Sequence, residues 1–174
     1  MFENIRNDYR MYRSFLHPAL WVLVVYRFGR WTETIKTDLI RRILDKTYWI
    51  IQRIVSTITT IDLTRGVTFG KNLHIIHPIS IVIHPKTIIG DNVGIMHEVT
   101  IGSRGTYAAP VIGNNVFIGV GAKILGEITI GDNVDIGANS VVLTDVPPNS
   151  LVVGIPGRII ENHVRKEWEY EPES

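Results

Sequence analysis

The sequence predicts a mainly β protein: a parallel β-helix of six-residue repeats, preceded by a short α-helical segment. From about residue 63 onward, apolar residues recur every six positions and are often followed by glycine. This period is neither the alternation of an amphipathic strand nor a heptad. It is typical of a solenoid in which three short strands complete one triangular coil. Before residue 60, glycine is scarce and the apolar residues follow a helical period instead.

Residues 1–60 are expected to form two or three amphipathic helices. The first candidate covers 2–15, where aromatic and charged residues alternate at helical spacing. The second covers 17–31 and has proline near its start, where a missing N–H costs little. The third covers 38–58 and is the most regular, with apolar residues at 39, 40, 43, 44, 48, 50, 51, 54 and 55.

Residues 61–160 are expected to form the β-helix, and 161–174 a C-terminal tail. Each repeat unit supplies one inward-facing apolar anchor, and the small or aliphatic residue four positions later fits the tight corner of the coil. The anchors are Leu63, Phe69, Ile75, Ile83, Ile89, Ile95, Ile101, Ile112, Ile118, Ile124, Ile130, Ile136 and Val142.

The six-residue period is interrupted twice. Eight residues separate Ile75 from Ile83, so two extra residues must bulge from that turn. Eleven residues separate Ile101 from Ile112, so a loop must leave the coil there. Function tends to sit where a regular scaffold is interrupted, and both breaks are therefore predicted to mark the site.

The six-residue spacing also predicts where two histidines lie relative to each other. His77 lies two residues beyond anchor Ile75, and His97 lies two beyond Ile95, one full coil later. We therefore expect them on one face, about 5 Å apart at the backbone, which is the spacing of neighbouring strands.

Composition excludes several functions. The chain has 174 residues, 18 basic against 17 acidic, and a net charge of +1, which gives no electrostatic case for nucleic acid. It has no cysteine, which excludes disulfides, thiolate zinc sites and cysteine nucleophiles and fits a reducing compartment. The apolar run 19–26 is too short to span a bilayer, and no secretory signal is visible, so we expect a cytoplasmic protein. The cluster YRFGRW at 26–31 suits either a membrane surface or, more simply, a helix or subunit interface.

The segment IGNNVFIGVGAKILGEITIGDNVDIGANSVVLTDVPPNSLVVGIPGRII, residues 112–160, resembles the C-terminal half of the serine acetyltransferase family. The motifs GAKILG, IGANSVVL, DVPPNS and GIPGR occur in the order that this family shows, and the resemblance extends over about 60–160. It implies a left-handed coil, a homotrimer with sites between subunits, and acetyl-CoA as the acetyl donor. The N-terminal helices look like the shorter helical part of members associated with bacterial polysaccharide synthesis.

The resemblance implies a catalytic pair. His77 matches the catalytic histidine of the family and Asp62 the aspartate that orients it. These roles suit the chemistry, because a hydroxyl must lose its proton to a base as it attacks a thioester, and a carboxylate on the other ring nitrogen stabilises the imidazolium. Backbone N–H groups near Gly102 and Ser103 are expected to face the thioester of the donor and its developing oxyanion.

The resemblance also implies a donor groove along the coils, where small side chains let the pantetheine arm lie against the backbone and cations meet the CoA phosphates. The fold requires small residues at the corners in any case, so these positions are explained equally well without a ligand. The matching positions are Gly119, Gly121, Ala122, Lys123, Ala138 and Arg158.

The sequence departs from the serine enzymes at the expected acceptor site. Ile76 stands where the family carries an acid before the catalytic histidine, and Ala108–Ala109 stand where it carries an arginine–histidine pair. Because a zwitterionic serine would lose those partners, the sequence favours a neutral sugar hydroxyl in capsule, exopolysaccharide or O-antigen synthesis. The alternatives are a serine O-acetyltransferase of cysteine biosynthesis, another acyl transfer such as N-acetylation of an amino sugar, and a non-catalytic β-helix interaction module.

Other polar residues lie near the two breaks. His97 and Glu98 are expected to bind the acceptor, or His97 to share the acid–base work, and Arg104 in the extruded loop to touch the acceptor. His74 and His84 are expected to face outward as surface residues. No metal site is expected, because histidines at this spacing diverge on flat strands and no carboxylate completes a ligand set.

Overall fold

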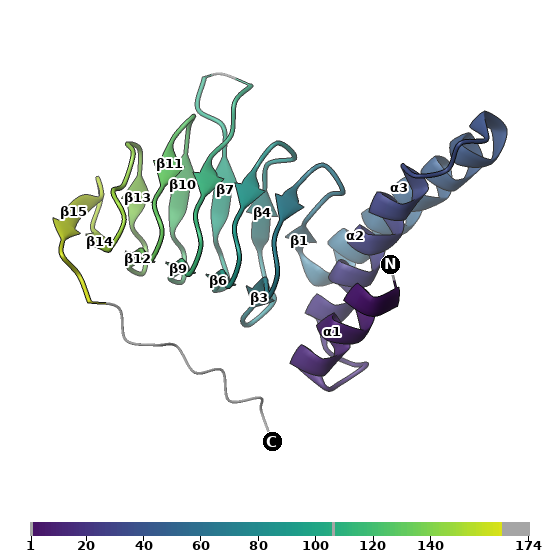
Figure 1. Ribbon diagram of the computed structural model, residues 1–174, viewed down its shortest axis with the longest axis horizontal. Coiled ribbons are helices and arrows are strands. Elements are labelled where there is room, and N and C mark those ends of the chain that lie inside the picture. The colour runs from purple at the N-terminus through teal and green to yellow at the C-terminus, as the bar shows by residue number, and fades with distance from the viewer. Residues whose placement is uncertain (1, 106, 165–174) are drawn as a thin grey trace.

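The computed structural model describes residues 2–105 and 107–164 and confirms the parallel β-helix (Figure 1). Short strands stack into three flat faces, with β15 alone running antiparallel. Face A contains β1 (Ile61–Asp62), β4 (Ile81–Ile83), β7 (Thr100–Gly102), β10 (Lys123–Leu125) and β13 (Val141–Val142). Face B contains β2 (Thr68–Phe69), β5 (Ile88–Ile89), β8 (Val111–Ile112) and β11 (Thr129–Ile130). Face C contains β3 (His74–Ile75), β6 (Gly94–Ile95), β9 (Phe117–Ile118), β12 (Asp135–Ile136), β14 (Ser150–Val153) and β15 (Arg158–Glu161).

Aliphatic anchors fill the interior of the coil. On face C the backbone register aligns one anchor from each strand, so that each side chain packs on the same position of the next coil. These side chains are fully buried, which explains why the six-residue period was so regular in the sequence. The aligned anchors are Ile75, Ile95, Ile118, Ile136 and Val152.

A ladder of asparagines turns one corner of the coil. Each has a positive φ between 53° and 58°, a left-handed conformation that asparagine tolerates better than most residues. Their side-chain amides bond from one coil to the next at 2.8–3.1 Å. The asparagine side-chain amides at this corner therefore bond to one another and need no partner in the core. Its members are Asn72, Asn92, Asn115, Asn133 and Asn149.

Three helices precede the coil and lie at its first-coil end: α1 (Phe2–Tyr12), α2 (Pro18–Thr32) and α3 (Asp38–Thr59) (Figure 1). Helices α2 and α3 approach closely at Gly29, where an added Cβ would lie 2.4 Å from a ring carbon of Tyr48. No helix in the described part of the chain is long and apolar enough to cross a membrane.

The helices cap the first coil through specific hydrogen bonds. The Tyr12 hydroxyl accepts from the Ile75 N–H at 3.0 Å, and the Tyr26 hydroxyl donates to the Val67 carbonyl at 2.8 Å. Arg27 lies over the Tyr26 ring and pairs with Asp8 at 3.2 Å. The first two side chains of the YRFGRW cluster, Tyr26 and Arg27, are therefore engaged inside the protein and are not available to a membrane surface.

Candidate active site

The first break in the repeat is an insertion at the corner between faces C and A. The Glu98 N–H donates to the Ile79 carbonyl and the Gly121 N–H to the His97 carbonyl, each at 3.0 Å. Ile79 is thus the backbone equivalent of His97, and the two inserted residues are His77 and Pro78. The prediction that His77 and His97 occupy equivalent positions of neighbouring coils is wrong in this respect.

The insertion nevertheless brings the two imidazole rings together. Their centroids lie 5.8 Å apart with the planes at 75°, an edge-to-face arrangement. His77 is exposed and has a φ of +52°, a conformation rarely adopted by a non-glycine residue and often found at functional sites. The Nδ1 atom of the half-buried His97 is shielded from solvent and has no hydrogen-bond partner within the described chain. The corner therefore presents one exposed imidazole and one unsatisfied ring nitrogen side by side.

Asp62 lies on β1 of face A in the preceding coil, two residues beyond the same corner. It follows Thr60 by two residues, and the Thr60 hydroxyl accepts from the N–H of Ser80, three residues after His77. The Asp62 carboxylate accepts a hydrogen bond at 3.0 Å from the side-chain amide of Gln52 on α3. No bond joins it to His77 in the described structure, so its role in orienting that ring stays a prediction.

Glu98 and Lys123 are linked beside the histidines. The Lys123 ammonium donates to the Glu98 carbonyl oxygen at 2.5 Å, which fixes the turn and leaves the Glu98 carboxylate exposed. Glu98 itself has a φ of +60°, the left-handed conformation of this corner. The lysine is thereby held close to the histidine pair, far from the C-terminal end of the stack.

The second break lies at the other end of face A. Gly102 ends β7, and its carbonyl accepts from the Gly126 N–H at 2.9 Å. Ser103 and Arg104 follow it into the exposed loop that projects from the coil (Figure 1). Ser103 lies five residues beyond Glu98 along this strand, a separation of about 16 Å. One chain alone therefore does not bring Arg104 or the Gly102–Ser103 pair to the histidines.

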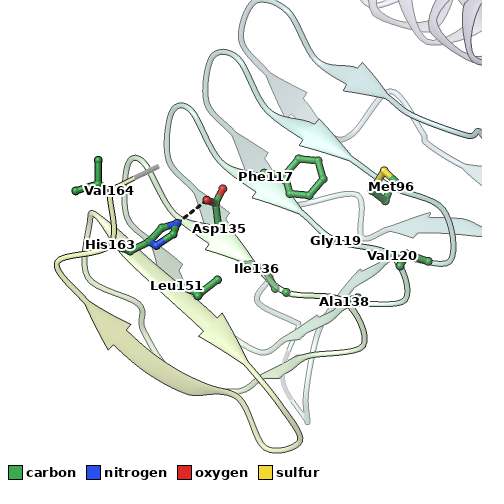
Figure 2. Close-up of a pocket in the computed structure, with 11 residues that line it drawn as sticks. Met96, Phe117, Gly119, Val120, Asp135, Ile136, Ala138, Leu151, His163 and Val164 are labelled. Atoms are coloured by element: carbon green, nitrogen blue, oxygen red, sulfur yellow. Dashed lines mark hydrogen bonds and ion pairs between the residues drawn. The ribbon is translucent and has the colours of Figure 1, made fainter. Parts of the chain in front are cut away.

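A groove of about 540 Å³ runs along face C (Figure 2). Met96, which directly precedes His97, lies at one end, and Leu151 and His163 lie at the other. Its floor is mostly apolar and includes Gly119 and Ala138, two positions predicted to hold CoA.

The floor of the groove follows one row of the backbone register. The row passes through Met96, Gly119 and Gly137, which line the groove. It continues beyond the lining residues through Val153 to Arg158 on β15. Four strand spacings separate its ends, about 19 Å. Arg158 is exposed and lies at the end of this row remote from the histidines, outside the residues that line the groove.

Two other predicted CoA positions lie off this row. Gly121 forms the corner next to His97, with a φ of +71° that favours glycine. Ala122 is fully buried, so its methyl group faces the core. Gly119 itself is required by packing, because an added Cβ would lie 2.7 Å from the Ile136 carbonyl oxygen.

Sequence reasoning missed a hydrogen-bonded histidine–aspartate pair in the groove. The His163 Nε2 lies 2.8 Å from the Asp135 Oδ2, and both side chains line the end of the groove near Leu151 (Figure 2). His163 falls in the segment assigned to the tail, of which residues 165–174 lie outside the described residues. The only available signal was Asp135, an outward-facing acid directly before a core anchor.

The expectation that His74 faces outward is wrong. His74 is only 6% exposed, because Tyr12 of α1 covers it with ring centroids 5.7 Å apart. Burial, with a smaller contribution from His17, lowers the His74 pKa to about 4. His84 is half-buried, and its Nδ1 accepts from the Lys86 N–H at 3.2 Å. Within 2–105 and 107–164, no group of three or more His, Cys, Asp or Glu side chains is placed to hold a metal ion.

Comparison with known proteins identifies the family. Residues 109–144 match the bacterial transferase hexapeptide family (six repeats), which fits the left-handed winding that the resemblance implied. The chain is 38% identical over 148 residues to the serine acetyltransferase of Helicobacter pylori, covering 83% of this chain and 82% of that protein. The chain belongs to the serine acetyltransferase family.

Other members differ in length. A serine acetyltransferase of Staphylococcus xylosus is 42% identical over 143 residues, which cover 78% of this chain and 64% of that protein. The corresponding match in Synechococcus elongatus covers only 57% of that relative, at 38% identity and 83% of this chain. This chain therefore spans about three fifths of the length of those two relatives.

Solved serine acetyltransferases share the fold. The Brucella abortus enzyme in complex with coenzyme A superposes with a TM-score of 0.77 at 30% identity, covering 95% of this chain and 69% of that one. The soybean enzyme complexed with serine superposes with a TM-score of 0.77 at 28% identity, covering 91% and 68%.

The expectation of a sugar acceptor is wrong. Relatives at 38–48% identity and the structural neighbours are serine acetyltransferases, which favours the alternative. The sugar argument rested on polar groups missing at Ile76 and at Ala108–Ala109. The absence of polar groups at these positions does not exclude serine, because other residues of a family member can bind the acceptor. The proposed link to polysaccharide synthesis rested on the same argument and is therefore dropped.

Proposed function

We propose that this protein is an acetyl-CoA-dependent serine O-acetyltransferase with His77 as general base. The observation that carries the proposal is the position of His77. It is held in a left-handed turn beside His97, at the corner from which the face C groove departs. Family membership supplies the reaction class, and this geometry supplies a base at the end of a groove for a long donor.

The reaction balances without any further reactant. The His77 imidazole takes the proton from the serine hydroxyl as its oxygen attacks the thioester carbonyl of acetyl-CoA. The tetrahedral intermediate then expels the CoA thiolate, and His77 returns the proton to the sulfur. The products are O-acetylserine and free CoA. Asp62 would stabilise the imidazolium formed between these steps.

The donor is proposed to lie along the face C groove. Its thioester would lie near Met96 and the histidine pair, its pantetheine arm over Gly119 and Ala138, and its anionic end toward Arg158. The apolar floor of the groove and the backbone row that continues from it to Arg158 support this direction. A small side chain on the floor lets a ligand approach the backbone closely.

The acceptor is proposed to contact His97, Glu98 and Arg104. Glu98 carries an exposed carboxylate for the ammonium group, and Arg104 a guanidinium for the carboxylate. Within one chain, about 16 Å of face A separates Ser103, the residue before Arg104, from Glu98 at the histidine corner. A neighbouring copy therefore has to supply either Arg104 or the histidines. We therefore propose a homotrimer with sites between subunits. The absence of cysteine favours the reducing cytoplasm as its compartment.

The experiment is product identification with the purified full chain, acetyl-CoA and L-serine. Mass spectrometry is expected to detect O-acetylserine, formed in equal amount to the CoA thiol released. The His77→Asn variant is expected to lose this product, and the His84→Asn variant, which alters a histidine remote from the corner, to retain it. CoA release that does not depend on serine would overturn the proposal.

A further inference from the structure

Helix α3 carries a stripe of large apolar side chains that no described part of the chain covers. Its buried residues, Tyr48 and Gln52, face the opposite way, toward α2 and the first coil. At 100° per residue the stripe spans an arc of about 100° and a length of about 29 Å. The side chains that form it are each 50–77% exposed and are Leu39, Ile40, Ile43, Ile50, Ile54 and Ile58.

Cations border this stripe along one edge. Arg42, Lys46 and Arg53 are exposed and fall within an arc of about 40° directly beside Leu39 on the helical wheel. None of the three forms a salt bridge with another described residue. The edge is therefore positive and free to meet anions.

Acidic residues do not neutralise this edge. Asp45 forms an ion pair with Arg65, and that contact holds the pKa of the Asp45 carboxyl below its usual value. The other acid of the helix is Asp38, in its first turn. The occupant that suits α3 is thus apolar along one strip and anionic along the next.

We propose that α3 lies in the interface of an anionic lipid bilayer. The apolar stripe would enter the acyl-chain boundary, and the cations would extend to the lipid phosphates. This is the pattern of an interfacial helix, in which Lys and Arg flank an apolar face. The cations recur from Arg42 to Arg53, so the helix lies along the surface rather than across it.

A second copy of the chain fits the stripe less well. Two α3 helices paired antiparallel about a two-fold axis would place the same edge of each helix together. Arg42 of one copy would then meet Arg53 of the other, with Lys46 between them and no acid on that edge. A bilayer containing acidic lipid supplies the missing negative charge. This surface is separate from the histidine corner and does not depend on the proposed function.

Vesicle sedimentation with the purified full chain tests the proposal. The chain is expected to sediment with vesicles of phosphatidylglycerol and phosphatidylcholine, to bind those of phosphatidylcholine alone at least about tenfold more weakly, and to be released by salt. The double variant Ile43→Asp/Ile54→Asp and the double variant Arg42→Gln/Arg53→Gln should each weaken binding by about tenfold or more.

Matched controls separate the surface from the fold. Arg41→Gln removes a cation from the far side of α3, and Ile88→Asp alters a half-exposed apolar residue on β5 of face B; both should bind as the wild type does. All variants should keep the wild-type circular dichroism, assembly mass and serine-dependent turnover. Failure of the wild type to prefer anionic vesicles would overturn the proposal. So would a smaller assembly in Ile43→Asp/Ile54→Asp, because the stripe would then be a contact between copies.

Discussion

The His77 ring meets the His97 ring edge to face, with 5.8 Å between centroids, although the two residues are not backbone equivalents. The regular coil places Ile79 in register with His97, and the inserted pair His77–Pro78 carries the extra imidazole out to it. The corner therefore holds two imidazoles where the repeat alone would give one. We expect His77 to transfer the proton and His97 to bind the acceptor, so mutations of the two should have different effects.

Removing the nitrogens of His97 is expected to weaken serine binding. The variant His97→Phe keeps a planar ring beside His77 but loses the shielded Nδ1, which has no partner within the described chain. If that atom bonds the acceptor, the KM for serine should rise about tenfold, the value of one hydrogen bond. Steady-state kinetics with both substrates checks this. An unchanged KM for serine would leave His97 a packing residue.

Asp62 has two possible duties that mutation separates. If it stabilises the His77 imidazolium, Asp62→Asn should lower kcat by about tenfold or more. Gln52→Leu removes the amide bonded to Asp62 but leaves the carboxylate, so it should retain most of the activity. If the two variants instead lose stability equally and keep wild-type kcat, Asp62 only joins α3 to the first coil.

Lowering the pH should destabilise the fold through His74. Its pKa is about 4 in the folded chain, below the ordinary 6.5, so the folded state keeps the ring neutral. Between pH 6.5 and 4 the unfolded chain binds a proton at this histidine and the folded chain does not. The free energy of unfolding is therefore highest above pH 6.5 and falls by about 1.4 kcal/mol per pH unit as the pH drops toward 4. His74→Phe should flatten that part of the stability profile measured by urea unfolding.

The asparagine ladder contributes stability in two ways that glycine and alanine distinguish. Asn115 has a φ of 53°, accepts from the Asn92 amide and donates to Asn133, both at 3.1 Å. Asn115→Gly loses the ladder bonds, but glycine adopts the positive φ without strain, so the free energy of unfolding should fall by about 1 kcal/mol. Asn115→Ala adds backbone strain and should cost about 1 kcal/mol more. Equal midpoints of urea unfolding for both variants would show that backbone strain is unimportant there.

The parts of the fold that the sequence predicted are those set by local spacing. Anchors such as Ile95 and Ile118 face inward in every coil, so a six-residue count is enough to identify the β-helix. The count also located an insertion between Ile75 and Ile83. It did not say which two residues are extra, because that depends on hydrogen bonds between coils such as the one from Glu98 to Ile79.

Contacts between residues that are far apart in the sequence could not be predicted from local spacing. His74 was expected at the surface, and it is buried because Tyr12, 62 residues earlier, packs over it. The His163–Asp135 pair forms where the chain folds back across β14 as β15, the antiparallel strand of face C. The acceptor was misjudged for a related reason, since two missing polar groups do not reveal which other residues take their place.

The central claim is that His77 takes the proton from serine, and the turnover number of His77→Asn tests it most directly. We predict that kcat for serine-dependent CoA release falls by about 10²–10⁴-fold. The KM for acetyl-CoA should stay near the wild-type value, because the groove begins beyond the mutated side chain. A His77→Asn variant that retains wild-type kcat would contradict the account.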